Sequence, residues 1–208
     1  MIIEQVLVGR MAVFCYLVGD PASGEAMLID PASDFEKING IVSRYGLRIT
    51  KIINSHGHFD HTSGNSYFCR TTGAELCIHE YDSSYLDYKI NRLAAFLKGG
   101  RSAEKKIRLL HDCESFSLGR LQVRVIHTPG HTAGSICLLC DGNLFTGDTL
   151  FTEGMGRTDF AGGSEKEIME SIRNRILTLP DDTKIWPGHN YGRFPVSTVR
   201  EQKRYYGV

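Results

Sequence analysis

Three histidines and one aspartate stand within six positions of this chain, at His56, His58, Asp60 and His61. Neutral imidazole nitrogens and carboxylate oxygens are the ligands that a borderline divalent metal ion prefers. Side chains alternate along an extended segment, so His56 and His58 should point the same way and bind one ion together. If the chain then turns into a helix, Asp60 and His61 are directed elsewhere and can begin a second site. A surface histidine cluster is the alternative interpretation.

Three later segments each place one more ligand-type residue directly after an expected strand and beside a glycine. These residues are His131 in Pro-Gly-His, Asp148 in Thr-Gly-Asp and His189 in Pro-Gly-His. Taken alone, each is typical of a solvated or packing residue in a loop. Together with the first segment they give seven candidate ligands, which are enough for two metal sites.

The seven residues divide into two sets around one bridging residue. Asp148 can bridge because a carboxylate has two oxygens to share. Each ion then keeps an open position for a shared water, which is typical of a catalytic rather than a structural site. The two sets are His56, His58 and His131 for one ion, and Asp60, His61 and His189 for the other.

The order of expected elements indicates an α/β fold of one domain, residues 1–208. Apolar, β-branched runs alternate with amphipathic segments, which predicts two packed sheets with helices outside, a four-layer sandwich. Asp34 and Ser164 are expected to cap helices, and residues 80–98 to form one or two helices that cover the metal loop or simply pack. Strands are expected at 2–8, 13–18, 26–30, 49–53, 75–79, 116–118, 121–126, 135–139, 143–146 and 184–186, and further helices at 34–45, 64–72, 164–177 and 197–206.

The composition excludes several classes of partner. Lys and Arg number 24, as do Asp and Glu, so the formal net charge is zero. That balance argues against a basic nucleic-acid-binding surface and gives no reason for docking on an anionic membrane. We see no secretory signal and no apolar run long enough to span a bilayer, and we expect a cytoplasmic protein with reduced thiols. Cys137 and Cys140 lie in one expected strand and should face opposite sides.

With these seven candidate ligands, the chain resembles the metallo-β-lactamase superfamily. This resemblance implies a four-layer αβ/βα sandwich with the metals at one edge. The Gly-Asp-Thr-Leu-Phe run at 147–151, the Gly-Arg-Thr-Asp-Phe run at 156–160 and the His-Asn-Tyr ending at Tyr191 carry the closest similarity. They are similar to the glyoxalase II-like (hydroxyacylglutathione hydrolase-like) branch and to the neighbouring persulfide dioxygenases. A cysteine usually completes the second site of true β-lactamases, and Asp148 sits in that role here, which disfavours lactam hydrolysis.

The resemblance implies a metal-dependent hydrolase that cleaves a thioester such as S-lactoylglutathione. Two divalent ions, zinc first with iron or manganese as alternatives, would lower the pKa of a shared water to near neutrality. The resulting metal-bound hydroxide would attack the carbonyl, with Asp60 orienting it and carrying a proton. We expect the partner to be a small molecule such as a glutathione conjugate, with neither nucleic acid nor membrane involved; the oligomeric state is not predicted.

Residues around the ligands also have expected roles. Arg157 and Tyr191 match positions that resemble glutathione-contacting residues, so they are the candidate substrate-binding residues. For Arg157 an internal salt bridge with Asp159 is the alternative. Asp30 and Asp159 are candidates for holding the imidazoles from behind, and a capping or turn aspartate is the alternative for Asp159.

Two other functions stay open at this stage. A persulfide dioxygenase acting on glutathione persulfide would use a single iron held by His56, His131 and Asp148. A non-catalytic metal-binding module would keep the fold without turnover.

Overall fold

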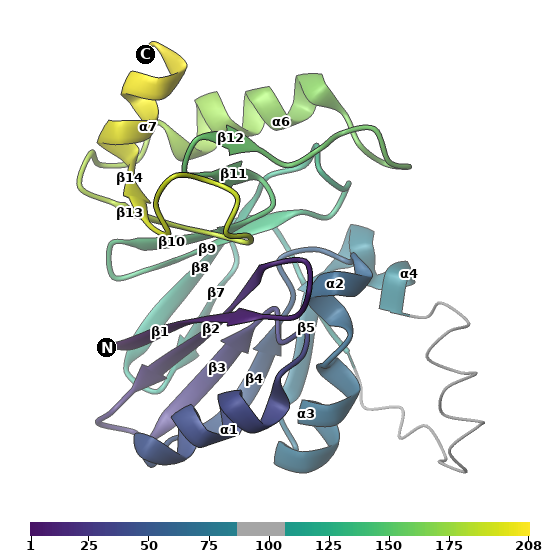
Figure 1. Ribbon diagram of the computed structural model, residues 1–208, viewed down its shortest axis with the longest axis vertical. Helices are drawn as coiled ribbons and strands as arrows, with labels where there is room; N and C mark the ends of the chain where they lie inside the picture. Colours follow the sequence, from purple (N-terminus) through teal and green to yellow (C-terminus); the bar gives the residue numbers. More distant parts are fainter. Residues whose placement is uncertain (87–106) are drawn as a thin grey trace.

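Two six-stranded β-sheets pack face to face in the computed structural model, which describes residues 1–86 and 107–208. Helices α1 and α3 lie outside the first sheet, and α6 and α7 lie outside the second (Figure 1). The predicted four-layer αβ/βα sandwich is therefore confirmed. The first sheet has the order β1 (Ile2–Val8), β2 (Val13–Asp20), β3 (Glu25–Ile29), β4 (Arg48–Ile53), β5 (Glu75–His79) and β6 (Arg108–Leu110), and the second has the order β14 (Ser197–Thr198), β13 (Lys184–Pro187), β10 (Asn143–Gly147), β9 (Ile136–Cys140), β8 (Leu121–His127) and β7 (Ser115–Leu118).

A two-stranded ribbon of β11 (Leu150–Phe151) and β12 (Gly154–Met155) accompanies the second sheet.

The helices are short and fill the outer layers. The helices are α1 (Phe35–Arg44), α2 (Phe59–Thr62), α3 (Asn65–Thr72), the 3₁₀ turn η1 (Glu80–Asp82), α4 (Ser83–Leu86), α6 (Glu165–Ser171), its π-helical continuation η2 (Ile172–Ile176), and α7 (Val199–Tyr206).

Burial on both faces explains why several strands are continuously apolar. All eight residues of β2 are buried. Tyr16 belongs to the core between the two sheets, whereas Leu17 belongs to the core under α1 and α3. A strand that buries both faces has no reason to alternate apolar and polar residues. Likewise Cys140 lies between the sheets while Cys137 packs toward α6, which confirms that these thiols face opposite sides.

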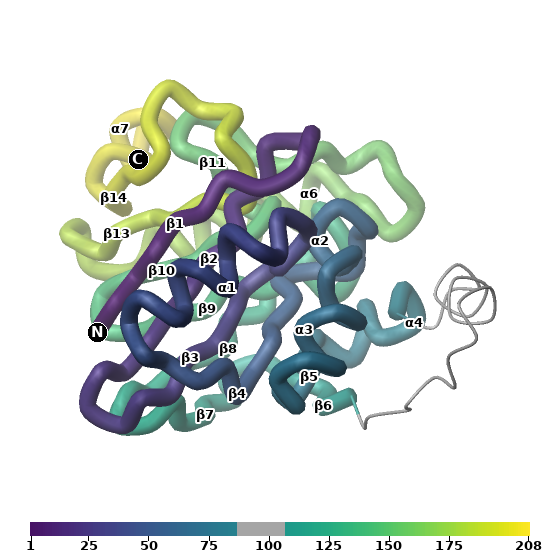
Figure 2. The backbone as a smooth tube through the Cα atoms, turned by 60° about the horizontal axis from the view of Figure 1, so that its bottom comes forward, coloured from purple at the N-terminus to yellow at the C-terminus, as the bar shows by residue number. Residues whose placement is uncertain are grey.

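The direction of the strands brings their carboxyl ends to one edge of the sandwich. Strands β3 to β6 run parallel to one another, and β10 runs parallel to β13. The loops after β10 and β13 are joined by a hydrogen bond from Gly188 N to the Gly147 carbonyl, at 2.7 Å. The turn between β1 and β2 lies beside the chain that follows β13, as Figures 1 and 2 show.

Of the two predicted helix caps, one is confirmed and one is wrong. The Ser164 hydroxyl accepts from the Glu167 N–H at 3.2 Å and caps α6. Asp34 stands at the start of α1, but its backbone is left-handed, with φ of 55°, and its side chain makes no cap hydrogen bond. Its carboxylate instead accepts from the Gly9 N–H at 2.7 Å. A capping side chain needs an extended backbone, which Asp34 lacks.

The prediction for residues 80–98 is only partly covered by the described chain. Residues 80–86 form η1 and α4, and residues 87–98 lie outside the described residues. The sequence did not predict β6, β11, β12 and β14, each two or three residues long, because such short runs carry no periodic signal; Ser197 and Thr198, expected in the last helix, form β14, and α7 begins at Val199. No helix in the described part of the chain is long and apolar enough to cross a membrane.

Substitutions at two glycines can test how tightly the start of α3 packs on the loop after β3. A Cβ at Gly64 would overlap the Pro31 carbonyl oxygen and lie 2.9 Å from the Phe35 ring, whereas one at Gly40 in α1 would meet nothing within 4 Å. We expect Gly64→Ala to lower the free energy of unfolding by about 1–3 kcal/mol through overpacking. Gly40→Ala, the matched control, should raise it by roughly 1 kcal/mol. Urea titration measures both, and a Gly64→Ala protein as stable as wild type would contradict this packing.

Candidate metal centre

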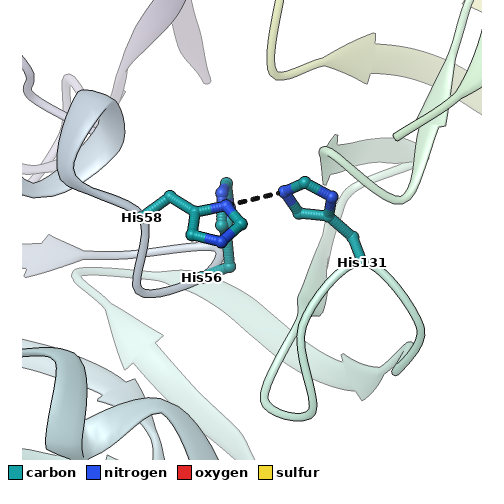
Figure 3. Close-up of side chains that lie close together, drawn as sticks. All are labelled: His56, His58 and His131. Carbon is teal, nitrogen blue, oxygen red and sulfur yellow. Dashed lines mark hydrogen bonds between the residues drawn. The ribbon is translucent and has the colours of Figure 1, made fainter. Parts of the chain in front are cut away.

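The first set of predicted ligands converges from two loops that belong to different sheets. His56 and His58 follow β4, and His131 follows β8 (Figure 3). One ligand atom from each of the three lies within 4.8 Å of the others. The His58 Nδ1 and His131 Nε2 atoms are 2.9 Å apart. His56 Nε2 is buried and has no hydrogen-bond partner. An orphaned, buried imidazole nitrogen aimed at two others is what an ion would satisfy.

The second set is formed by Asp60, His61 and His189, and it too lies within 4.8 Å. The Nε2 atoms of His61 and His189 are 3.0 Å apart. Asp60 Oδ2 lies 3.7 Å from His61 Nε2 and 3.5 Å from His189 Nε2. Two imidazole ligands of one tetrahedral zinc ion would sit about 3.4 Å apart, so the spacing of these atoms fits a metal.

Hydrogen bonds at the back of the rings direct lone pairs into the centre. His131 Nδ1 donates to the Arg157 carbonyl at 2.7 Å, and His189 Nδ1 donates to the Met11 carbonyl at 2.8 Å. A carbonyl only accepts, so Nδ1 carries the proton in both rings. In the neutral rings Nε2 is then a free lone pair. Because such an arrangement fixes the tautomer that binds metal, it is the usual support of histidine ligands.

Asp30 performs the same task for His61. Its carboxylate accepts from the Ser55 N–H at 2.8 Å and the Ser55 hydroxyl at 2.6 Å, and its Oδ2 lies 3.0 Å from His61 Nδ1. The structure therefore places Asp30 behind the imidazoles, as predicted. The same prediction for Asp159 is wrong, because Asp159 is an exposed residue that pairs with Arg157.

Asp148 lies between the two sets. Its Oδ2 is 3.6 Å from His131 Nε2 and 3.2 Å from His189 Nε2, and its Oδ1 is 3.5 Å from His61 Nε2. Oδ1 is buried without a hydrogen-bond partner. The carboxylate thus reaches toward both sets, which is the position a bridging ligand needs. All seven residues predicted as ligands are brought together.

The charges of the centre favour a bound cation. Burial opposes protonation of His61, but the carboxylates of Asp148 and Asp30 outweigh burial and raise the pKa of His61 to about 9. Burial would raise the pKa of Asp148, yet His61 and His189 hold it well below its usual range. The pKa of His56 lies well below its usual value, because burial and the neighbouring His61 both disfavour its charged form. The carboxylates of the centre therefore stabilise a positive charge, which the His61 imidazole carries as a proton and a bound metal ion could supply in its place.

A cavity of about 720 Å³ opens onto the centre. Both predicted substrate-binding residues line it. The Arg157 guanidinium pairs with Asp159 at 2.6 and 2.5 Å and lies 4.0 Å above the Phe160 ring, so the salt bridge left open as an alternative is present. Tyr191 stacks on the His189 ring at 4.3 Å and donates to the Met11 carbonyl at 3.0 Å.

The sequence did not point to Met11, and it pointed to Tyr85 only as part of residues 80–98, which were expected to cover the metal loop or simply pack. Met11 acts through its backbone carbonyl, and because every residue has one, the residue type could not identify it. Tyr85 packs its ring 5.8 Å from that of His58 and lines the cavity, and its position in an aromatic-rich stretch was the available signal. The remaining lining is largely apolar, and consists of Phe59, Phe151, Met155, Phe160 and Ala161 besides the residues already named.

Comparisons with known proteins agree with this geometry. The family described as the Metallo-beta-lactamase superfamily matches residues 8–189. A beta-lactamase hydrolase-like protein of Agrobacterium fabrum is 36% identical over 91% of the chain, and the chain spans about half (48%) of that protein. The human mitochondrial persulfide dioxygenase ETHE1 is 32% identical over 91% of the chain and 68% of its own length. The probable polyketide biosynthesis zinc-dependent hydrolase PksB of Bacillus subtilis is 27% identical over 90% and 77%.

Solved structures share the fold closely. The BLEG-1 B3 metallo-beta-lactamase superposes with a TM-score of 0.84 at 28% identity, covering 98% of this chain and 97% of that one. TTHA1623, solved in a di-iron-bound form, gives a TM-score of 0.79 at 28% identity over 97% and 98% of the two chains. Zinc and iron thus both occur in the names of similar proteins.

Two single substitutions, one in each ligand set, test whether the two sets bind separate ions. We expect wild-type protein to bind two divalent ions, and His131→Ala and His189→Ala to bind one each, because each variant breaks a different set. Metal analysis after dialysis measures the stoichiometry. His111→Ala is the control, since His111 is exposed and pairs with Glu80. Loss of both ions in both variants would contradict the division into two sets.

Proposed function

Because the chain belongs to the metallo-beta-lactamase superfamily, we propose that it is a hydrolase that cleaves a thioester with water activated between two divalent ions. The observation that carries the proposal is the complete set of seven ligands around one cavity, with Asp148 placed between the two sets. A non-catalytic module would be under no constraint to keep all seven. The similarity to a probable zinc-dependent hydrolase supports zinc as the first candidate, with iron or manganese as alternatives.

Bound ions would lower the pKa of a shared water and polarise the substrate carbonyl. The histidines present lone pairs, and their Nδ1 hydrogen bonds keep the rings from turning. Asp60 borders the cavity, and 20% of its side chain is exposed, so it can touch both water and substrate. In the reaction the water oxygen bonds to the thioester carbon and the C–S bond breaks. The proton that Asp60 accepts from the water passes to the leaving sulfur.

The walls of the cavity favour a substrate with both apolar and anionic parts. Phe59, Phe160 and Tyr191 are exposed aromatic rings around the opening. Arg157 would bind a substrate carboxylate, such as one of glutathione, after leaving Asp159. That exchange is feasible because an exposed ion pair contributes only about 0–1 kcal/mol. A glutathione thioester such as S-lactoylglutathione is therefore the substrate class that we propose.

One observation favours a second candidate, a persulfide dioxygenase. The similarity to human ETHE1 extends over 91% of the chain. Such an enzyme would hold a single iron by His56, His131 and Asp148, two histidines and a carboxylate that leave positions open. The 3.6 Å distance between Asp148 Oδ2 and His131 Nε2, and the grouping of His56 with His131, support this combination.

Ligand variants distinguish the two activities. We expect His58→Ala to abolish S-lactoylglutathione hydrolysis while leaving the fold intact, because it removes a ligand of the first ion. His61→Ala should abolish hydrolysis as well, since it removes a ligand of the second. The measurement is thioester cleavage by protein whose metal content has been determined, with circular dichroism to confirm folding.

The opposite pattern would support the dioxygenase. Iron content of one per chain, oxygen uptake on glutathione persulfide, and uptake that survives His61→Ala would replace the hydrolase proposal. A β-lactam belongs in the same assay, because a B3 metallo-beta-lactamase is among the structural neighbours. Unchanged thioester turnover in His58→Ala would contradict the mechanism outright.

A further inference from the structure

A buried carboxylate outside the set of seven ligands joins the two loops of the first set. Asp82, in η1 after β5, has no exposed surface. Its Oδ2 accepts from the Gly57 N–H and from the Thr132 hydroxyl, both at 2.7 Å, and its Oδ1 accepts from the Gly134 N–H at 2.8 Å. Each oxygen of the carboxylate is therefore hydrogen-bonded.

The partners of Asp82 sit next to the ligands. Gly57 lies between His56 and His58, and Thr132 directly follows His131. A single side chain thus connects the loop from the first sheet to the loop from the second. A backbone hydrogen bond from Ile136 N to the Ser55 carbonyl, at 2.8 Å, also connects these regions at the base of the two loops.

Glycines on both loops allow the turn at 82–85 to approach closely. A Cβ at Gly134 would lie 2.6 Å from both the backbone nitrogen and the carboxylate of Asp82. A Cβ at Gly57 would lie 2.6 Å from the Tyr85 side chain. Any side chain at either position would push the turn away from the loops, and with it the carboxylate that joins them.

The chemistry of Asp82 is suited to holding the two ligand loops at a fixed distance from each other. A buried carboxylate is costly unless its oxygens are hydrogen-bonded, and hydrogen bonds to a charged acceptor are shorter and stronger than neutral ones. Three such bonds to two separate loops hold the loops at one distance. That distance sets the 2.9 Å separation of His58 Nδ1 and His131 Nε2.

We propose that Asp82 is a positioning residue of the first metal site, which keeps His58 and His131 at ligand spacing before an ion arrives. It does not line the cavity and belongs to neither ligand set. It acts only through the two loop backbones and the Thr132 hydroxyl. This inference rests on the proposed metal centre but not on the identity of the substrate.

Metal affinity tests the inference one site at a time. In a His189→Ala background, which keeps only the first site, adding Asp82→Asn should weaken zinc binding about tenfold to a hundredfold, the usual effect of losing a supporting hydrogen bond. In a His131→Ala background, which keeps only the second site, the same change should alter affinity less than about twofold. Competition with a chromophoric chelator measures both dissociation constants, using zinc alone as the probe.

The neighbouring carboxylate supplies the matched control. Glu80 lies in the same turn and pairs with His111 at the surface, so Glu80→Gln should leave both affinities unchanged. A merely structural role for Asp82 would lower the melting temperature and weaken both sites equally, and that result would overturn the inference. If Asp82→Asn fails to fold, Thr132→Val removes a single donor and should still weaken the first site selectively.

The outcomes also separate this inference from the proposed function. Selective loss of first-site affinity in a protein that cleaves no thioester would uphold the role of Asp82 and reject the substrate. Equal affinities in folded Asp82→Asn and its parent would overturn the role of Asp82 alone. A wild-type protein that binds no zinc would overturn both.

Discussion

The structure depends on imidazole nitrogens whose lone pairs face one another at short distance. Such an arrangement is stable only when a proton or a metal ion lies between the nitrogens. The Nε2 atoms of His61 and His189 are 3.0 Å apart, while the Nδ1 atom of each ring faces an oxygen on the other side. Two such nitrogens repel one another unless a proton or a metal ion lies between them. The Asp148 and Asp60 carboxylates hold the His61 imidazole in its protonated form, with its pKa raised to about 9, so without a metal ion a proton supplies the positive charge between the rings. The folded chain therefore presents a site whose electrostatic energy is lowest with metal bound.

The sandwich makes this arrangement possible because it holds repelling groups on rigid elements. Five of the ligands lie in loops that follow strands hydrogen-bonded on both sides, Asp60 and His61 lie in α2, and the parallel pairs β3 with β4 and β10 with β13 align the strand ends. The core between the sheets supplies the stability that the polar edge does not. Support then comes from behind each ring, from the Asp30 carboxylate, the Met11 carbonyl and the Arg157 carbonyl.

Residue type and spacing predicted the ligands well and their supports poorly. His56 and His58 follow from alternation along an extended segment, and Asp30 follows from its place at the end of an expected strand, just before Pro31. Asp34 was misjudged because a left-handed backbone, invisible in the residue type, turned its carboxylate toward Gly9. Met11 could not be predicted, since it acts through its main chain. Asp82 could not be predicted either, because its three donors come from segments that only the folded chain brings together.

The Met11 carbonyl ties the second site to the order in which the chain is synthesised. It accepts from His189, and the two residues are 178 positions apart. A nascent chain emerging from the ribosome can bring His56, His58 and His131 together well before His189 exists, so one half of the centre can mature earlier than the other. Contacts of such long sequence separation are entropically costly and form late. Completing the second set therefore requires the turn between β1 and β2 to meet the loop after β13.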